Sequence, residues 1–304
     1  HAMLADSLAH IAQACRDSVD ARDIAEALDP VVARLRQSVH LGPTAFGLYF
    51  ELADRLLVGN LPAASTAARQ LAVEPAKPPL SVLRRGSAGP FDTVFDLRMG
   101  ADAARFDVVD PRAADAFLPV LTDGLALLDA GAPALAGELR AILSTIVLAE
   151  APPGAVTEFD GASHYQFWGL VLLNPHHHRT PLAVAEALAH EAGHGLLFGL
   201  TRTVALVRNP DDALFPSPLR ADPRPMDGIF HATFVSARMA WTMETLADSG
   251  VLSPAEAAQA RAEAAKDRAN FWAGQAVIAA HGDLTPTGAA ILASATQAVR
   301  DGWT

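Results

Sequence analysis

The chain has 304 residues, of which 51% are hydrophobic and 19% are charged, and its formal net charge at pH 7 is −11. This balance is typical of a folded globular protein of enzyme size and excludes a disordered chain. With 23 lysines and arginines in total, the sequence lacks the clustered cations that hold a phosphate backbone, so we predict no nucleic-acid partner.

The apolar segments of the chain are short. The stretch from Met3 has no basic lead and no continuous apolar core of signal-peptide type, which predicts a cytoplasmic protein. The longest apolar run, around Phe167 to Leu173, is far too short to span a bilayer, so we predict no membrane role. Cys15 is the only cysteine, which excludes an intrachain disulfide and a zinc cluster built from cysteines.

The N-terminal part of the sequence has helical patterns. Apolar residues recur at three-to-four spacing over residues 3–28, which predicts an amphipathic helix, and another helix is expected over 44–57. A stretch rich in proline and glycine then interrupts the periodicity. We predict a helical N-terminal region at 3–75, a connection at 76–90 and a catalytic, metal-binding region at 91–304, with one single domain as the alternative.

Beyond the connection, capped helices flank two apolar runs. Asp110 and Pro111 form an N-cap and first-turn pair that opens a pair of helices running to Leu143. Runs rich in Val, Ile and Leu at 145–150 and 169–174 predict strands of a small sheet.

Further helices are expected toward the C-terminus. They cover residues 181–200, 228–247, 254–281 and 286–300. The helix at 254–281 has a capping box formed by Ser253 and Glu256, with proline at its first position and Gly282 after its last residue. The helix at 181–200 begins with Thr180 and Pro181.

A His-Glu-x-x-His motif lies within the apolar segment 182–200. His190 and His194 are four residues apart, so their imidazoles lie on one helical face and can reach one metal ion. Glu191 projects roughly 100° away around the axis, which favours a base beside the metal over an adjacent ligand. Glu186 is the other polar side chain of this segment, so the helix should be buried nearly all round. Burying these ionisable groups is costly unless they are paired, hydrogen-bonded or bound to a metal. This favours His190 and His194 as ligands of a metal ion.

The third ligand has two candidates. A metzincin continuation is excluded because Leu197 and Leu200 stand where that class has a glycine and a third histidine. His231 and Glu244 are both expected on the next long helix, and helical geometry alone does not choose between them. A glutamate ligand would suit a zinc peptidase with Glu191 as general base, whereas His231 would complete a three-histidine site for zinc or iron.

A longer block follows the motif. Residues 217–235 read Ser-Pro-Leu-Arg-Ala-Asp-Pro-Arg-Pro-Met-Asp-Gly-Ile-Phe-His-Ala-Thr-Phe-Val. With the strand-like run Gly-Leu-Val-Leu-Leu-Asn at 169–174, this block resembles the HExxH-type peptide β-hydroxylase family of ribosomal-peptide biosynthesis. The resemblance implies a non-haem Fe(II)- and 2-oxoglutarate-dependent oxygenase that uses O2 to hydroxylate a side-chain β-carbon of a precursor peptide. It also favours His231 as the third ligand.

The distal carboxylate of 2-oxoglutarate needs a cation, and the planar fork of arginine matches a carboxylate best. Arg220, Arg224 and Arg238 are the candidates. Arg238 follows His231 by seven residues, so on a continuous helix it faces the same side about 10 Å further along. Arg220 and Arg224 lie in a Pro-rich loop, where they would bind the co-substrate or the peptide. A surface ion pair is the alternative for all three.

The predicted fold class is mainly α with a small β-sheet (α+β), in a zincin-like arrangement of a metal-binding helix beside a short sheet. The first functional hypothesis is the peptide hydroxylase, in which Glu191 would orient a ligand or block a coordination position. The alternative is a gluzincin-type zinc metallopeptidase with Glu191 as base. A third hypothesis is a non-catalytic peptide-binding protein with a structural metal.

Overall fold

The computed structural model describes residues 1–77, 79–155, 159–217, 220 and 222–302. Within them the chain is mainly helical, with a four-stranded sheet and a two-stranded hairpin, which confirms the general form of the predicted fold class. Every described helix is too short or too polar to cross a lipid bilayer. Contacts divide the chain into unit 1, residues 1–114 and 143–174, and unit 2, residues 115–142 and 175–304. The predicted division at residues 75–90 stays a prediction.

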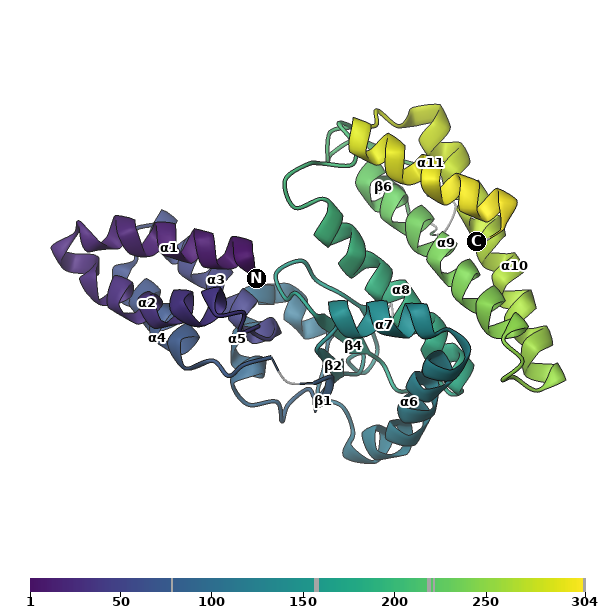
Figure 1. Cartoon of the computed structure of the whole chain (residues 1–304), viewed down its shortest axis with the longest axis horizontal. Coiled ribbons are helices and arrows are strands. Elements are labelled where there is room, and N and C mark those ends of the chain that lie inside the picture. Colours follow the sequence, from purple (N-terminus) through teal and green to yellow (C-terminus); the bar gives the residue numbers. More distant parts are fainter. Residues whose placement is uncertain (78, 156–158, 218–219, 221, 303–304) are drawn as a thin grey trace. The chain divides into compact units, whose positions relative to one another are not determined.

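Unit 1 begins with a layer of helices that bury apolar faces against one another (Figure 1). They are α1 (Ala2–Arg16), α2 (Arg22–Arg36), α3 (Pro43–Leu57), α4 (Leu61–Val73) and α5 (Pro90–Met99). The single helix expected over residues 3–28 is wrong, because the chain breaks after α1 and Ser18 adopts an extended backbone with φ −106° and ψ 125°. Asp17 and Ser18 are residues whose side chains compete for backbone hydrogen bonds and so disfavour a continuous helix.

The sheet of unit 1 has the order β1-β2-β4-β3. Its strands are β1 (Ser81–Arg84), β2 (Thr145–Leu148), β3 (Gly161–Ala162) and β4 (Leu170–Leu173). β1, β2 and β4 are parallel and β3 is antiparallel to β4. All residues of β2 and β4 are buried, which is why both read as continuous apolar runs. Both strands were predicted, whereas β1, which lies within residues 76–90, was not.

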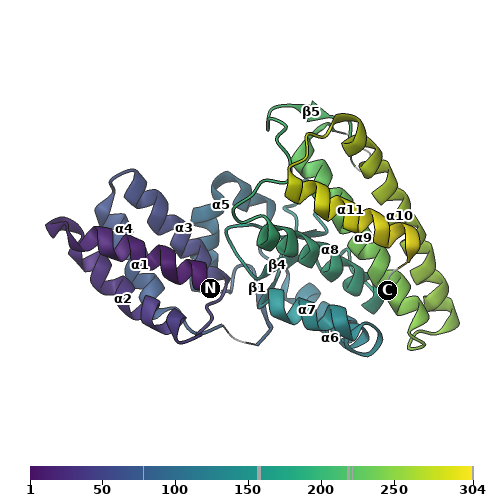
Figure 2. The same ribbon diagram turned by 45° about the horizontal axis from the view of Figure 1, so that its top comes forward.

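Unit 2 is built from long helices and one short hairpin. They are α6 (Pro111–Gly131, which starts in unit 1), α7 (Pro133–Ile142), α8 (Pro181–Leu200), α9 (Met226–Asp248), α10 (Pro254–His281), α11 (Pro286–Asp301), β5 (Leu214–Phe215) and β6 (Arg224–Pro225). The helices expected here are confirmed, including the capping box of Ser253 and Glu256. α9 and α10 lie side by side along most of their length (Figures 1 and 2), and α8 packs on α9.

Two carboxyl groups meet inside unit 2. Glu186 of α8 and Asp267 of α10 share a side-chain hydrogen bond, and Asp267 is 2% exposed. Burial, and then the charge of Glu186 and the hydrogen bond to it, raise the pKa of Asp267 to about 8. Burial also raises the pKa of Glu186, with Glu263 adding to the effect. Asp267 therefore holds a proton at neutral pH and donates it to Glu186.

We expect the variant Asp267→Asn to weaken the pH dependence of folding stability. Asp267 keeps its proton in the folded chain up to pH about 8, whereas an unfolded aspartate loses its proton near pH 4. The stability that this proton contributes is complete below about pH 4 and is lost as the pH rises through about 8. Asparagine still donates to Glu186 without titrating. The unfolding free energy of the wild type should fall with rising pH, and in Asp267→Asn the slope of this fall should be smaller by up to about 1.4 kcal/mol per pH unit.

Urea unfolding between about pH 5 and about pH 8 measures this decline. Asp248→Asn is the matched control, because its side chain is 75% exposed and ion-paired with Arg261. If the unfolding free energies of the wild type and Asp267→Asn change with pH at the same slope, the Asp267 carboxyl does not hold a proton in the folded chain.

Candidate metal centre

The motif histidines lie in the middle of α8, facing α9. Thr180 begins α8, and its Oγ1 accepts a hydrogen bond of 3.2 Å from the backbone N–H of Ala183. Gly193 allows the two helices to approach closely, because a Cβ there would lie 3.1 Å from Cγ1 of Val235 on α9. The absence of a side chain at Gly193 thus permits the close approach of a neighbouring helix.

Three imidazoles gather at this contact and are called here the imidazole cluster: His190 and His194 of α8 and His231 of α9. His190 Nε2 lies 3.2 Å from His194 Nε2, and His194 Nδ1 lies 3.2 Å from His231 Nδ1. The rings of His194 and His231 stack, with their centroids 5.4 Å apart and their planes 17° from parallel. The structure therefore brings together the three histidines that the sequence predicted as ligands.

The spacing of the first pair suits one metal ion. Two nitrogens that each lie about 2.1 Å from a metal, at about 100° to one another, are about 3.2 Å apart. His190 and His194 have this separation between their Nε2 atoms. His231 instead contacts the other nitrogen of His194, and the two nitrogens of one imidazole point away from each other. Within the described residues, no group of three or more His, Cys, Asp or Glu side chains is placed so that it could hold a metal as it stands.

Two imidazoles of the cluster, those of His194 and His231, favour the neutral form. Burial lowers the pKa of His194 well below its usual range, and the neighbouring His190 and His231 lower it further. Burial also lowers the pKa of His231, although Asp227, whose Oδ2 lies 3.8 Å from His231 Nε2, acts in the opposite direction. A neutral ring keeps the lone pair that binds a metal.

Two neighbours of the cluster were not predicted. Sδ of Met239 lies 3.2 Å from Nδ1 of His190. The ring of Phe198 lies 6.5 Å from that of His194 and 5.5 Å from that of His231. Phe198 follows His194 by four residues, and Met239 follows His231 by eight, so helical spacing was a usable signal for both.

Glu191 is buried beside the motif. Its side chain is 5% exposed, and Oε1 lies 3.8 Å from Nε2 of His190. This is the nitrogen that also faces His194. Glu191 thus adjoins the face of the histidine pair where a metal would lie, as expected for a group beside the metal.

Glu244, the other candidate for third ligand, forms an ion pair on a different side of α9. Its two oxygens accept hydrogen bonds from Nε and Nη2 of Arg268 on α10, the second at 2.7 Å. Thirteen residues separate Glu244 from His231, which corresponds to a rotation of about 140° around the helix axis. Since His231 faces α8, Glu244 lies on the side of α9 turned toward α10.

The three candidate arginines differ in their surroundings. Arg220 is exposed, and Pro218, Leu219 and Ala221 around it lie outside the described residues. Arg224 forms an ion pair of 2.8 Å with the exposed Asp222, as the surface alternative predicted. Arg238 adjoins the motif, because its Cγ lies 3.5 Å from the position of a Cβ on Gly193. Its guanidinium donates to Glu138 of α7.

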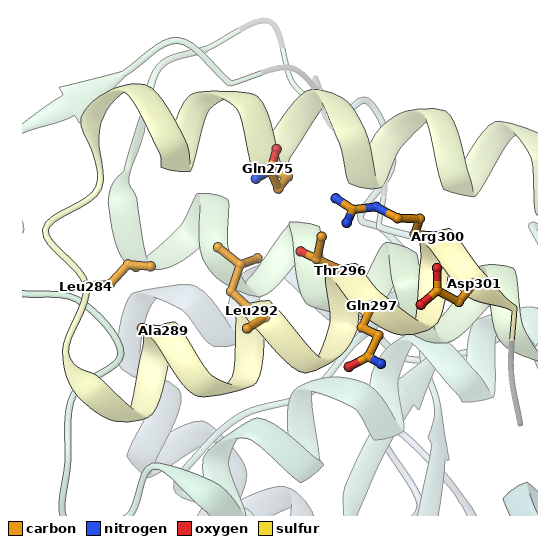
Figure 3. Close-up of a pocket in the computed structure, with 9 residues that line it drawn as sticks. Gln275, Leu284, Ala289, Leu292, Thr296, Gln297, Arg300 and Asp301 are labelled. Carbon is orange, nitrogen blue, oxygen red and sulfur yellow. The ribbon is translucent and has the colours of Figure 1, made fainter.

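A groove of about 580 Å³ lies elsewhere in unit 2, between α10 and α11 (Figure 3). Leu284 and Leu292 give it an apolar part, and Arg300 extends from α11 toward Gln275 of α10 (Figure 3). None of the histidines of the imidazole cluster lines this groove. It therefore adds nothing to the candidate metal centre.

A scan against protein-family models gives no match to this chain, and a search of curated proteins gives none.

Proposed function

We propose that this chain is a non-haem Fe(II)- and 2-oxoglutarate-dependent oxygenase that hydroxylates a side-chain β-carbon of a ribosomally made precursor peptide in the cytoplasm. The position of His231 is the main support. It lies 3.2 Å from His194, and it is the residue that the resemblance favours as third ligand. Glu244, which a gluzincin needs, is held by Arg268 on the side of α9 turned toward α10.

In this proposal His190, His194 and His231 hold the metal. Bound Fe(II) would supply the activation of O2, with 2-oxoglutarate as the electron source for inserting one oxygen atom into a C–H bond. His194 contacts its two neighbours through different nitrogens, so one ring must turn before all three share a metal. The zincin-like placement of the metal-binding helix beside the sheet is part of the proposal.

The surroundings of the cluster suit such a site. The ring of Phe198 adjoins those of His194 and His231 and gives both an apolar neighbour. Arg238 would provide the positive charge for the distal carboxylate of the co-substrate, since it lies beside Gly193 of the motif. Arginine suits this role because two of its N–H groups can meet one carboxylate.

A zinc peptidase is the second candidate, and the position of Glu191 favours it. A carboxylate 3.8 Å from Nε2 of His190 lies where a general base could take a proton from a metal-bound water. An oxygenase has no need for such a base. The two candidates therefore differ in what Glu191 does.

The test is anaerobic loading with Fe(II), followed by 2-oxoglutarate, O2 and a mixture of candidate precursor peptides. We expect succinate together with a peptide that has gained one oxygen atom. The variant Glu191→Gln should retain this activity, whereas it would lower a peptidase activity by about 100-fold or more. Peptide cleavage with zinc and no succinate would overturn the proposal. Metal binding without either product would instead indicate the non-catalytic alternative.

A further inference from the structure

The side chain of Arg238 contacts residues from three helices of unit 2. Its side chain is 15% exposed, and its Nη2 donates to a carboxylate oxygen of Glu138 on α7. Its Cζ lies 4.6 Å from the centroid of the Trp241 ring, one turn further along α9. Gly193 of α8 is the third neighbour, with a Cβ position 3.5 Å from Cγ of Arg238. A cation is thus enclosed beside the His-Glu-x-x-His motif.

The donors of this guanidinium are incompletely used. Arginine has five N–H donors. Among the described residues, no acceptor forms a hydrogen bond with the buried Nε of Arg238. Burial lowers the pKa of Arg238, and Glu138 offsets part of that effect. Burying a guanidinium without a carboxylate partner is costly. Here the partner is a single oxygen of Glu138, which accepts a hydrogen bond from Nη2.

Arg268, on α10 of the same unit, shows what a complete ion pair looks like in this chain. Its Nε and Nη2 both donate to Glu244, and its Nη1 donates to the backbone oxygen of Val299 at 2.8 Å. Arg238 contacts Glu138 through one nitrogen, and its buried Nε has no acceptor among the described residues. Arg268 is thus held through three nitrogens, whereas the contact of Arg238 with Glu138 uses one.

We propose that Arg238 is a binding site for a small dicarboxylate, and that Glu138 is an internal carboxylate that occupies this site until the ligand displaces it. The choice of a dicarboxylate rests on the proposed function, whose co-substrate belongs to that class. Glu138 is the partner that can leave, because its side chain is 29% exposed against 15% for Arg238. It can turn to water at little cost, while the arginine stays buried and takes two oxygens of the incoming carboxylate.

The test measures glutarate binding to the metal-free protein by calorimetry. Glu138→Gln removes the competing charge and should tighten binding roughly 10-fold, as expected for loss of one charged hydrogen bond. Glu138→Asp, which shortens the reach to Arg238, should tighten it as well and serves if the first variant folds poorly. Arg238→Gln should abolish binding. Asp129→Asn is the matched control, because it removes the same charge from an exposed ion pair with Arg140.

Equal affinity of the wild type and both Glu138 variants, or no binding by any of them, overturns the inference. The inference is also overturned if the Glu138 variants bind a peptide with one glutamate more tightly than the wild type does but bind glutarate no more tightly. Arg238 would then bind the peptide substrate and not a small dicarboxylate. No step depends on iron or turnover. Tighter glutarate binding without succinate formation would therefore refute the proposed reaction and leave the role of Glu138 standing.

Discussion

Replacing His231 with alanine should lower the affinity for a divalent metal by about 100-fold or more, while Glu244→Gln should leave that affinity unchanged. Loss of a group that merely orients a ligand costs about 10- to 100-fold in metal affinity, and loss of a ligand should cost at least the upper value. His231 lies 3.2 Å from His194, whereas Glu244 pairs with Arg268. Co(II) titration in competition with a chelator measures the affinity, and the absorption spectrum of the bound Co(II) reports its coordination geometry.

His10→Ala is the matched control for this experiment, because His10 is an exposed histidine on α1 in the other unit. It should bind Co(II) as the wild type does. The opposite pattern, with metal lost in Glu244→Gln and kept in His231→Ala, would refute the three-histidine set. It would restore the ligand set of a gluzincin.

Gly288→Ala should destabilise the fold by about 3 kcal/mol, even though alanine is the better helix former. A Cβ on Gly288, in the first turn of α11, would lie 2.1 Å from the backbone oxygen of Leu206. That oxygen cannot easily move, because it accepts a hydrogen bond of 3.0 Å from the backbone N–H of Thr285. Leu206 is itself 1% exposed. Denaturant unfolding of the whole chain measures the loss.

The same substitution on α7 is the control. Gly137 is an exposed helical residue, and a Cβ there would meet no atom within 4 Å. Gly137→Ala should therefore stabilise the protein by about 0.5 to 1 kcal/mol. A loss of stability at Gly137, or none at Gly288, would show that helix propensity outweighs the contact with Leu206.

Local signals predicted most of the helices. Capping residues such as Thr180, Ser253 and Asp110 act on backbone groups a few residues away, so a short stretch of sequence specifies each start. Pairing over a distance is different. β1 pairs with β2, where Ser81 lies opposite Thr145, and nothing near Ser81 encodes a partner so far along the chain. The strand β1 was therefore not predicted, because it lies in an interval rich in proline and glycine.

The site divides in the same way. His190 and His194 share one helix, so their spacing alone predicted a common face. The sequence left His231 and Glu244 open as third ligand and the resemblance favoured His231, which the contact between α8 and α9 brings to His194. Arg238, seven residues after His231, lies beside Gly193 of the motif. Its carboxylate partner, Glu138, lies 100 residues earlier on another helix, which no local pattern could show.

The contact between His194 and His231 joins points that are 37 residues apart in the chain. A metal shared by these side chains would act as a reversible crosslink across the intervening segment. It would restrict the unfolded chain, as a disulfide does, and bind the folded chain preferentially. The melting temperature would then rise with metal concentration, and backbone amides of α8 and α9 would exchange with solvent more slowly in the loaded protein.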